Sequence, residues 1–230
     1  MTLISESDRT TIRERFGELI HPLTFLVFTS EDDCRYCEHT RALIEELASL
    51  DERISVRTID AAADPALVAQ YGIDKFPAIA VLGLLPGSEP SDDPGAAPVQ
   101  QDTGIRFYGI PAGYEMLTLI EDAIAVSRRD PGLSGEMQAW LATLDHPVHL
   151  QVFVTPTCPY CPRAVVLAHR LALASPHIRA DMVEATEFPD LAERYDVYGV
   201  PRTVINETVA VEGAVPEAHL LEHLRESVAA

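Results

Sequence analysis

The feature that most constrains the fold of this chain is an internal repeat, in which the second half of the sequence matches the first. Its four cysteines form two CxxC pairs, Cys34-Arg35-Tyr36-Cys37 and Cys158-Pro159-Tyr160-Cys161, and an offset of 124 residues takes the first pair onto the second. The same offset matches Leu47 with Leu171, Ile54 with Ile178, Asp60 with Glu184, Pro65 with Pro189, Leu67 with Leu191, Tyr71 with Tyr195, and Pro77 with Pro201. Agreement at so many turn, strand and helix positions indicates a tandem duplication.

Hydrophobic periodicity predicts the same α/β unit in each half. In the first half we expect strands over residues 23–28, 54–59, 78–82 and 105–108, and helices around Ile12 and Phe16, after Cys37, and over residues 65–71 and 116–127. In the second half we expect strands over residues 148–154, 178–183, 203–205 and 208–211, and helices over residues 137–144, after Cys161, and through Leu220 and Leu224. Each half therefore reads as one α/β module.

The helix-stop and turn residues over 128–132 predict a boundary between a domain of residues 1–130 and a second of residues 131–230. The first half also carries about 20 extra residues, an insertion over about residues 83–103. Proline, glycine and acidic residues dominate it, so we expect a solvated loop. Because it follows the strand after Pro77, it should turn at the end of the sheet opposite the cysteines, which argues against a substrate lid.

Composition excludes several classes of protein. The chain has 230 residues, 47% of them hydrophobic, and 17 basic residues against 36 acidic ones give a net charge of −19. Such acidity predicts neither a nucleic-acid nor an anionic-membrane partner, because both would repel it. No apolar run reaches the roughly 18 residues of a membrane span, and the N-terminal residues do not resemble a secretory signal. We therefore expect a cytoplasmic protein.

Four cysteines confined to two CxxC motifs indicate redox chemistry or metal binding. One zinc site of four thiolates is the metal alternative, but zinc motifs bring their pairs together over about 15–20 residues, and 120 residues separate Cys37 from Cys158. The eight histidines are not matched to one another by the 124-residue offset, so packing or surface roles are expected for them. The sequence predicts no metal site.

A strand, a CxxC at a helix start and a proline 43 residues after the first cysteine resemble the thioredoxin/glutaredoxin superfamily, and Cys158-Pro159-Tyr160-Cys161 is typical of glutaredoxins. Two such units in tandem resemble the protein disulfide oxidoreductases of archaea and bacteria. The resemblance implies an α/β fold of two tandem thioredoxin-like domains, each a central mixed sheet flanked by helices. It also implies that Cys34 and Cys158 are the nucleophiles, that Cys37 and Cys161 resolve the mixed disulfide, and that Pro77 and Pro201 are cis prolines facing the two sites.

One position departs from the thioredoxin pattern. Thioredoxins carry a buried aspartate six residues before the first cysteine, where this chain has Phe28 and Val152. Asp60 and Glu184 could replace this aspartate as proton acceptors. Alternatively, they simply end their strands in solvent. The sequence leaves both interpretations open.

The helix start favours a thiolate, because its unpaired N–H groups and dipole stabilise negative charge. A cis proline would leave the backbone of Phe76 and Val200 able to pair with an extended substrate. The two sites should differ, since Glu31, Asp32 and Asp33 crowd Cys34 while no acid adjoins Cys158. We therefore predict a lower pKa and a more oxidising couple for the second site.

These features predict a dithiol–disulfide oxidoreductase that reduces, forms or isomerises protein disulfides, with the C-terminal site dominant. No bound cofactor is expected, and electrons would come from an external thiol or a donor like thioredoxin reductase. Two alternatives stay open: a dedicated redox relay to one partner such as a peroxidase, and a non-enzymatic zinc-binding module.

Overall fold

A computed structural model describes residues 2–32, 34–84 and 99–229. The first half contains α1 (Glu6–Phe16), β1 (Leu23–Thr29), α2 (Cys37–Ala48), β2 (Ile54–Asp60), α3 (Pro65–Gln70), β3 (Ala78–Gly83), β4 (Gln101–Tyr108) and α4 (Glu115–Arg128). The second half contains α5 (Gly135–Leu141), β5 (Val148–Val154), α6 (Cys161–Ala174), β6 (Ile178–Glu184), α7 (Pro189–Arg194), β7 (Arg202–Ile205), β8 (Val209–Glu212) and α8 (Glu217–Ala229). The order of elements is the same in both halves, as the repeat predicts.

The strands of both halves form one sheet of eight, in the order β2-β1-β3-β4-β6-β5-β7-β8. The sequence led us to expect one sheet in each unit; instead the two four-stranded sheets join edge to edge. Strands β4 and β6 pair in parallel from Ile105 opposite Ala180 to Tyr108 opposite Val183. This pairing satisfies backbone groups that would otherwise stand open at two sheet edges. Hydrophobic periodicity predicts which face of a strand is buried, but it does not predict which strands will pair along their edges.

The connections place both CxxC motifs at the same edge of the sheet. Strands β1 and β4 are each antiparallel to β3, β4 is parallel to β6, and β6 is parallel to β5. Strands β1 and β5 therefore point the same way, and each leads at its carboxyl end into a CxxC. The insertion leaves the opposite edge, between Gly83 and Gln101, as expected; its residues 85–98 lie outside the described part of the chain.

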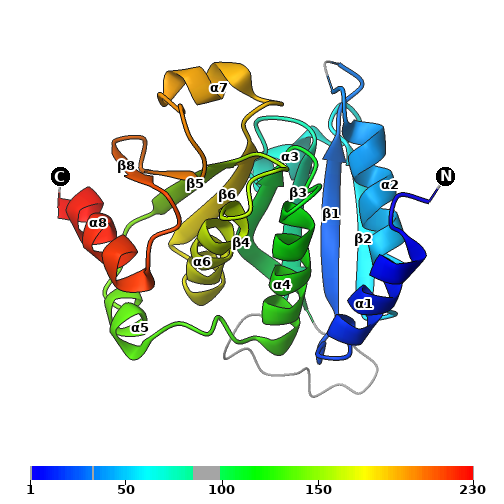
Figure 1. Cartoon of the computed structure of the whole chain (residues 1–230), viewed down its shortest axis with the longest axis horizontal. Helices are drawn as coiled ribbons and strands as arrows, with labels where there is room; N and C mark the ends of the chain where they lie inside the picture. Colours follow the sequence, from blue (N-terminus) through cyan, green and yellow to red (C-terminus); the bar gives the residue numbers. More distant parts are fainter. Residues whose placement is uncertain (1, 33, 85–98, 230) are drawn as a thin grey trace.

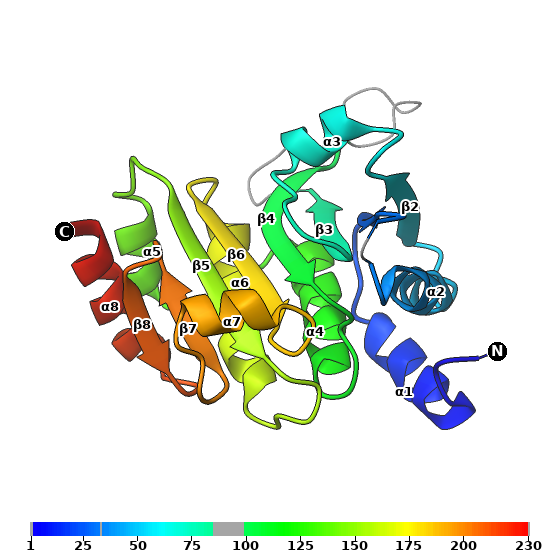
Figure 2. The ribbon, with the colours of Figure 1, turned by 90° about the horizontal axis from the view of Figure 1, so that it is seen from above.

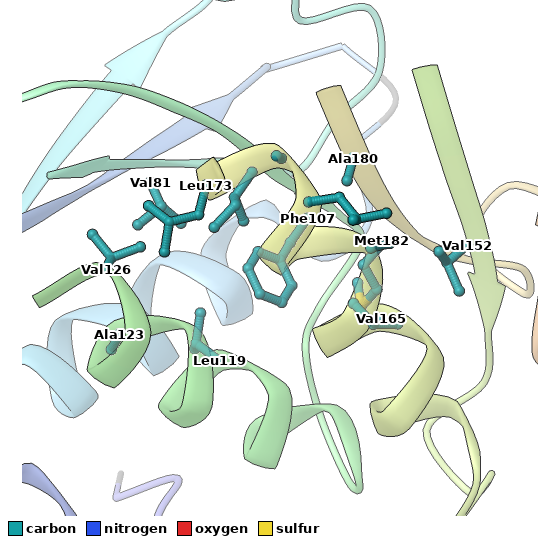
Figure 3. Packing of buried hydrophobic residues seen from close by; sticks show 14 of the residues in the cluster. Val81, Phe107, Leu119, Ala123, Val126, Val152, Val165, Leu173, Ala180 and Met182 are labelled. Atoms are coloured by element: carbon teal, nitrogen blue, oxygen red, sulfur yellow. The ribbon is translucent and has the colours of Figure 1, made fainter. Parts of the chain in front are cut away.

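The helices cover the two faces of the sheet unequally (Figures 1 and 2). Helices α1, α2, α4, α5, α6 and α8 contribute to the larger apolar cluster on one face, whereas α3 and α7 pack on the other. Figure 3 shows the middle of the larger cluster, where Leu119 of α4 and Val165 of α6 meet Phe107 and Met182 of the sheet. Both helices that begin at a CxxC, α2 and α6, thus lie on the same face.

A buried hydrogen-bonded pair, Asp122 and His169, connects α4 of the first half with α6 of the second. The Nδ1 atom of His169 lies 2.6 Å from a carboxylate oxygen of Asp122, and both side chains are almost fully buried. The imidazole also packs edge-on against Phe107, with ring centroids 4.9 Å apart. Burial of such a pair is tolerated only when the two groups stay together, so the pair fixes how α4 and α6 lie against each other.

Helix α4 ends where the boundary between the halves was predicted. Arg129 adopts φ 58° after the last turn, and Gly132 follows with φ 60°, a left-handed conformation that stops a helix. The division at residues 130 and 131 remains a prediction, because the halves share one sheet. Within the described residues, no helix is both long enough and apolar enough to cross a bilayer.

Candidate active sites

The first site is a disulfide between Cys34 and Cys37, whose Cα atoms lie 5.5 Å apart. Cys37 is the first residue of α2 and is buried, whereas Cys34 precedes the helix and is partly exposed. The backbone N–H of Ser30 points to the Cys37 sulfur at 3.4 Å. Exposure therefore favours Cys34 as the sulfur that an external disulfide reaches.

The second site repeats this arrangement with Cys158 and Cys161, again 5.5 Å apart at Cα. Cys161 begins α6 and is fully buried, while Cys158 retains 7% exposure. Here the backbone N–H of Cys161 donates to the Cys158 sulfur at 3.1 Å. Such a donor stabilises a thiolate once the disulfide is reduced.

The prolines predicted to be cis are cis, at Phe76–Pro77 and Val200–Pro201. Each precedes the strand next to its CxxC strand, and the Val200 carbonyl oxygen lies 3.7 Å from the Cys158 sulfur. The repeat also extends to the far side of each loop: Gly109 donates its N–H to the Pro77 carbonyl at 3.0 Å, and Gly213 donates to that of Pro201 at 2.8 Å. The structure thus brings the predicted residues together at each site; their catalytic and substrate-binding roles remain predictions.

The two acids matched by the repeat have a local role. An Asp60 oxygen accepts the N–H groups of Ala62 and Ala63, both at 2.9 Å. Glu184 accepts those of Thr186 at 3.2 Å and Glu187 at 2.8 Å. Every hydrogen bond of these carboxylates within the described residues goes to the turn that follows its own strand. Both carboxylates thus close a turn at a strand end, as one interpretation expects, but Glu184 is 2% exposed and does not lie in solvent.

A different acid, missed at the sequence level, lies beside the second site. Helix α4 begins against the loop before Cys158, because Tyr114 donates its N–H to the Pro156 carbonyl at 3.0 Å. Its next residue, Glu115, is 1% exposed and accepts a hydrogen bond of 2.7 Å from the Thr118 hydroxyl. The other carboxylate oxygen of Glu115 is buried without a hydrogen-bond partner among the described residues. Burial raises the pKa of Glu115 to about 7.

The register of α4 on α6 places this carboxylate at the level of Cys161. The two helices run in the same direction, and Asp122 meets His169. Glu115 lies two turns before Asp122, and Cys161 and Pro162 lie two turns before His169, a step of about 10 Å on each helix. A sequence signal existed: Glu115, Thr118 and Asp122 form a polar stripe on an otherwise apolar helix.

The two disulfides do not meet. Strands β3, β4 and β6 lie between β1 and β5 in the sheet. Four steps between neighbouring strands, each of about 4.8 Å, separate the strand ends by about 19 Å. Direct exchange between the two pairs of sulfurs is therefore excluded in this arrangement. Within the described residues, no cluster of three or more metal-ligating side chains is present.

Comparison with known proteins gives the same fold and motif. The thioredoxin domain family matches residues 148–226. A structure of the NTD_N/C domain of the alkylhydroperoxide reductase AhpF from Enterococcus faecalis superposes with a TM-score of 0.84 and 28% identity, covering 96% of this chain and 99% of that one. A protein disulfide oxidoreductase from Aeropyrum pernix superposes with a TM-score of 0.85 and 28% identity, covering 98% of this chain and 94% of that one.

Curated relatives are longer than this chain. A protein named NADH dehydrogenase from Ferdinandcohnia aciditolerans is 24% identical over 199 residues, which are 86% of this chain and 33% of the relative. The alkyl hydroperoxide reductase AhpF of Staphylococcus epidermidis is 29% identical over 106 residues, which are 46% of this chain and 20% of the relative. The chain thus spans about a third or less of the length of these relatives.

Fold, sites and comparisons agree. Each half has the strand, CxxC helix and cis-proline loop of a thioredoxin fold, and the matched structures cover nearly the whole chain. The chain therefore consists of two thioredoxin folds in tandem, each with one CxxC disulfide, and is similar over nearly its whole length to a protein disulfide oxidoreductase and to the NTD_N/C domain of AhpF.

Proposed function

We propose that the chain reduces protein disulfides through both sites, with the C-terminal site dominant, and that it receives its electrons from a separate NADH-dependent reductase or an attached one. The observation that carries this proposal is the matched geometry of the two sites: a more accessible cysteine, a buried cysteine at a helix start, and a cis-proline loop beside them. The cytoplasm suits it, because a reducing compartment keeps such pairs cycling.

At the second site, the Cys158 thiolate attacks a substrate sulfur, and the substrate's other sulfur leaves as a thiolate. Cys161 then attacks the Cys158 sulfur, which releases the substrate cysteine and leaves the site oxidised by two electrons. The buried Glu115 carboxylate, at the level of Cys161, takes the proton from the Cys161 thiol. At the first site Cys34 and Cys37 act in the same order. Supply of two electrons and two protons restores each dithiol.

Backbone groups of the cis-proline loops align the substrate. The Val200 carbonyl oxygen lies 3.7 Å from the Cys158 sulfur, close enough for an extended segment to pair with this loop beside the reacting atoms. Pro201 carries no N–H, so the loop presents its carbonyl without a competing donor. Phe76 and Pro77 hold the same position at the first site.

A second candidate function is a relay to one dedicated partner such as a peroxidase. It is favoured by the 28% identity over nearly the whole chain with part of the alkylhydroperoxide reductase AhpF. The distance of about 19 Å between the sites fits a relay in which partners, rather than the two disulfides themselves, carry electrons from one site to the next.

Insulin reduction tests the general activity. The wild type is compared with the Cys34→Ser/Cys37→Ser and Cys158→Ser/Cys161→Ser proteins, with glutathione and with thioredoxin reductase plus its nicotinamide as donors. We expect the wild type to reduce insulin and loss of the second pair to cost more than loss of the first. A protein that leaves insulin intact but supports peroxide turnover with a peroxidase from the same organism would be a relay. Failure in both assays would reject the proposed function.

A further inference from the structure

The first site opens into a groove that the second half of the chain helps to build. The groove has a volume of about 1030 Å³, at the upper end for clefts that hold small ligands. One side of the groove is formed by residues next to Cys34 and Pro77, namely Asp32, Arg35, Tyr36, Lys75 and Phe76. The other side is formed by α7 of the second half and the turn before it, from Thr186 to Arg194. A substrate that reaches Cys34 therefore passes between the two halves.

The second site has different neighbours. It lies beside β7 and β8 at the other end of the sheet, and Gly113 and Tyr114 of the first half contact its loop at Pro156. The neighbouring aromatic side chains stand out in solvent, with Tyr160 65% and Tyr198 93% exposed. The repeat places Asp74, a groove residue, where the second half has Tyr198. The surroundings of the two sites thus differ: the groove with α7 lies at the first site, whereas two exposed tyrosines lie at the second.

The groove combines apolar walls with charged side chains. Phe76, Phe188 and Leu191 line it and are partly buried. The titratable residues that face it are Asp32, Arg35, Asp74, Lys75, Glu187, Asp190 and Arg194.

Two of the three basic side chains that line the groove form salt bridges with acidic side chains. Lys75 pairs with Asp74 at 2.6 Å, and Arg194 pairs with Glu207 at 3.0 Å. The third, Arg35, lies over the Tyr36 ring at 5.2 Å. Glu187 accepts the N–H of Ile110 at 2.7 Å. Within the described residues, Asp32 and Asp190 remain without a salt bridge against this one guanidinium, so the groove favours a positively charged occupant.

We propose that this groove binds an extended polypeptide segment that carries a lysine or arginine next to its disulfide-bonded cysteine. The two walls admit a single strand of chain, whose backbone meets Phe76 and whose basic side chain meets Asp190. The first site would thereby act on unfolded or terminal segments. This inference rests on the proposed thiol–disulfide exchange at the first site.

The test uses the Cys158→Ser/Cys161→Ser protein, reduced beforehand, and three short peptides with arginine, serine or glutamate beside one cysteine. Each cysteine is joined to thionitrobenzoate as a mixed disulfide. Cys34 attacks the peptide sulfur and expels coloured thionitrobenzoate; Cys37 then displaces the peptide thiol and closes the Cys34–Cys37 disulfide. The leaving group of the first step is common to all three peptides, so rate differences in that step report binding rather than thiol acidity.

We expect thionitrobenzoate release to be about three- to tenfold faster from the arginine peptide than from the glutamate peptide at low ionic strength. Added salt should narrow the difference. Asp190→Lys should remove it. Glu193→Lys is the matched control, since it makes the same charge change on α7 at a residue that does not line the groove. The Cys34→Ser/Cys37→Ser protein, measured with the same peptides, reports the second site.

The possible results distinguish a failure of the groove inference from a failure of the proposed exchange reaction. Equal rates for all peptides, or equal effects of Asp190→Lys and Glu193→Lys, overturn the groove inference and leave the exchange reaction standing. No release from any peptide rejects exchange at the first site itself. Each α7 variant is also unfolded in urea, and an unchanged midpoint shows that the variant folds.

Discussion

Tyr114 and Pro156 join the first half of the chain to the second active site: the Tyr114 N–H donates to the Pro156 carbonyl at 3.0 Å, two residues before Cys158. The contact is close because the preceding residue is glycine. Gly113 adopts φ 62°, and a Cβ atom there would lie 2.2 Å from the same carbonyl oxygen. The first half thus supports the loop of the second site, whereas the first site faces an open groove.

Replacing Gly113 with alanine should loosen this support. The left-handed backbone and the clash with Pro156 together should lower the free energy of unfolding by about 1–3 kcal/mol. The displaced loop should also slow thiol exchange at Cys158. Urea unfolding and second-site kinetics measure the two effects. Gly135→Ala is the control, because nothing lies within 4 Å of a Cβ atom there, and a loss of equal size in that variant would contradict the explanation.

Glu115→Gln should slow resolution at the second site. The pKa of Glu115 is about 7, so its carboxylate accepts a proton above neutral pH and loses that ability as the pH falls through 7. In the Cys34→Ser/Cys37→Ser protein, we expect the substitution to slow release of the substrate thiol at pH 8 by about tenfold or more. The inflection near pH 7 should disappear from the rate profile.

The control for this measurement is Glu121→Gln, on the same helix but paired with Arg15 at 2.7 Å. It should leave the profile unchanged. An inflection that persists in Glu115→Gln would show that another group accepts the proton of Cys161.

The same substitution should stabilise the oxidised protein at alkaline pH. Burial raises the folded pKa of Glu115 to about 7, above that of an unfolded glutamate. The folded state therefore holds a proton that the unfolded state releases between about pH 4.5 and 7, and stability falls as the pH rises through this window. The shift corresponds to at most about 3 kcal/mol.

Urea unfolding at pH 5 and pH 8 measures this cost. Glu115→Gln should raise the free energy of unfolding at pH 8 by about 1–3 kcal/mol and flatten its pH dependence. Part of the slope should remain, because burial also raises the pKa of Glu187 to about 7. An unchanged slope would show that Glu115 is not the group that titrates.

The sequence predicted what the repeat and local periodicity determine. Up to the insertion, the strands, the CxxC helices and the cis prolines at Pro77 and Pro201 lie where the 124-residue offset places them. For Asp60 and Glu184 the sequence left two interpretations open; both carboxylates accept turn N–H groups, and Glu184 is buried rather than in solvent.

What the sequence could not predict depends on contacts between distant segments. The pairing of β4 with β6 joins two open edges, and no local pattern says which edges will meet. Glu115 belongs to the first half, so its position at the level of Cys161 follows only from the packing of α4 on α6. The wall that α7 forms beside the first site has the same origin. The prediction that Asp33 crowds Cys34 lies outside the described residues.

Cys34 and Cys158 should not form a disulfide with each other. The Cys37→Ser/Cys161→Ser protein leaves one nucleophile at each site, with strand ends about 19 Å apart. Oxidation of dilute protein should leave two free thiols or join two chains. Peptide mapping under non-reducing conditions detects the products, and the wild type with its two native disulfides is the reference. Complete formation of a Cys34–Cys158 bond within one chain would show that the halves move apart and close again.

The pKa of the Cys158 thiol should be lower than that of Cys34 once both disulfides are reduced. The Cys161 N–H donates to the Cys158 sulfur at 3.1 Å, whereas the exposed acids Glu31 and Asp32 stand before Cys34. A donor stabilises a thiolate and neighbouring acids oppose it. Thiolate absorbance in the two proteins that each keep one CxxC measures both values. Replacing Glu31 and Asp32 with their amides should lower the pKa of Cys34 and leave that of Cys158 unchanged.

Since a stabilised thiolate favours the reduced form, the disulfide of the second site should also be the more oxidising of the two, and equilibration with glutathione measures this difference. If Cys34 proves to have the lower pKa, electrons would pass from the second site to the first.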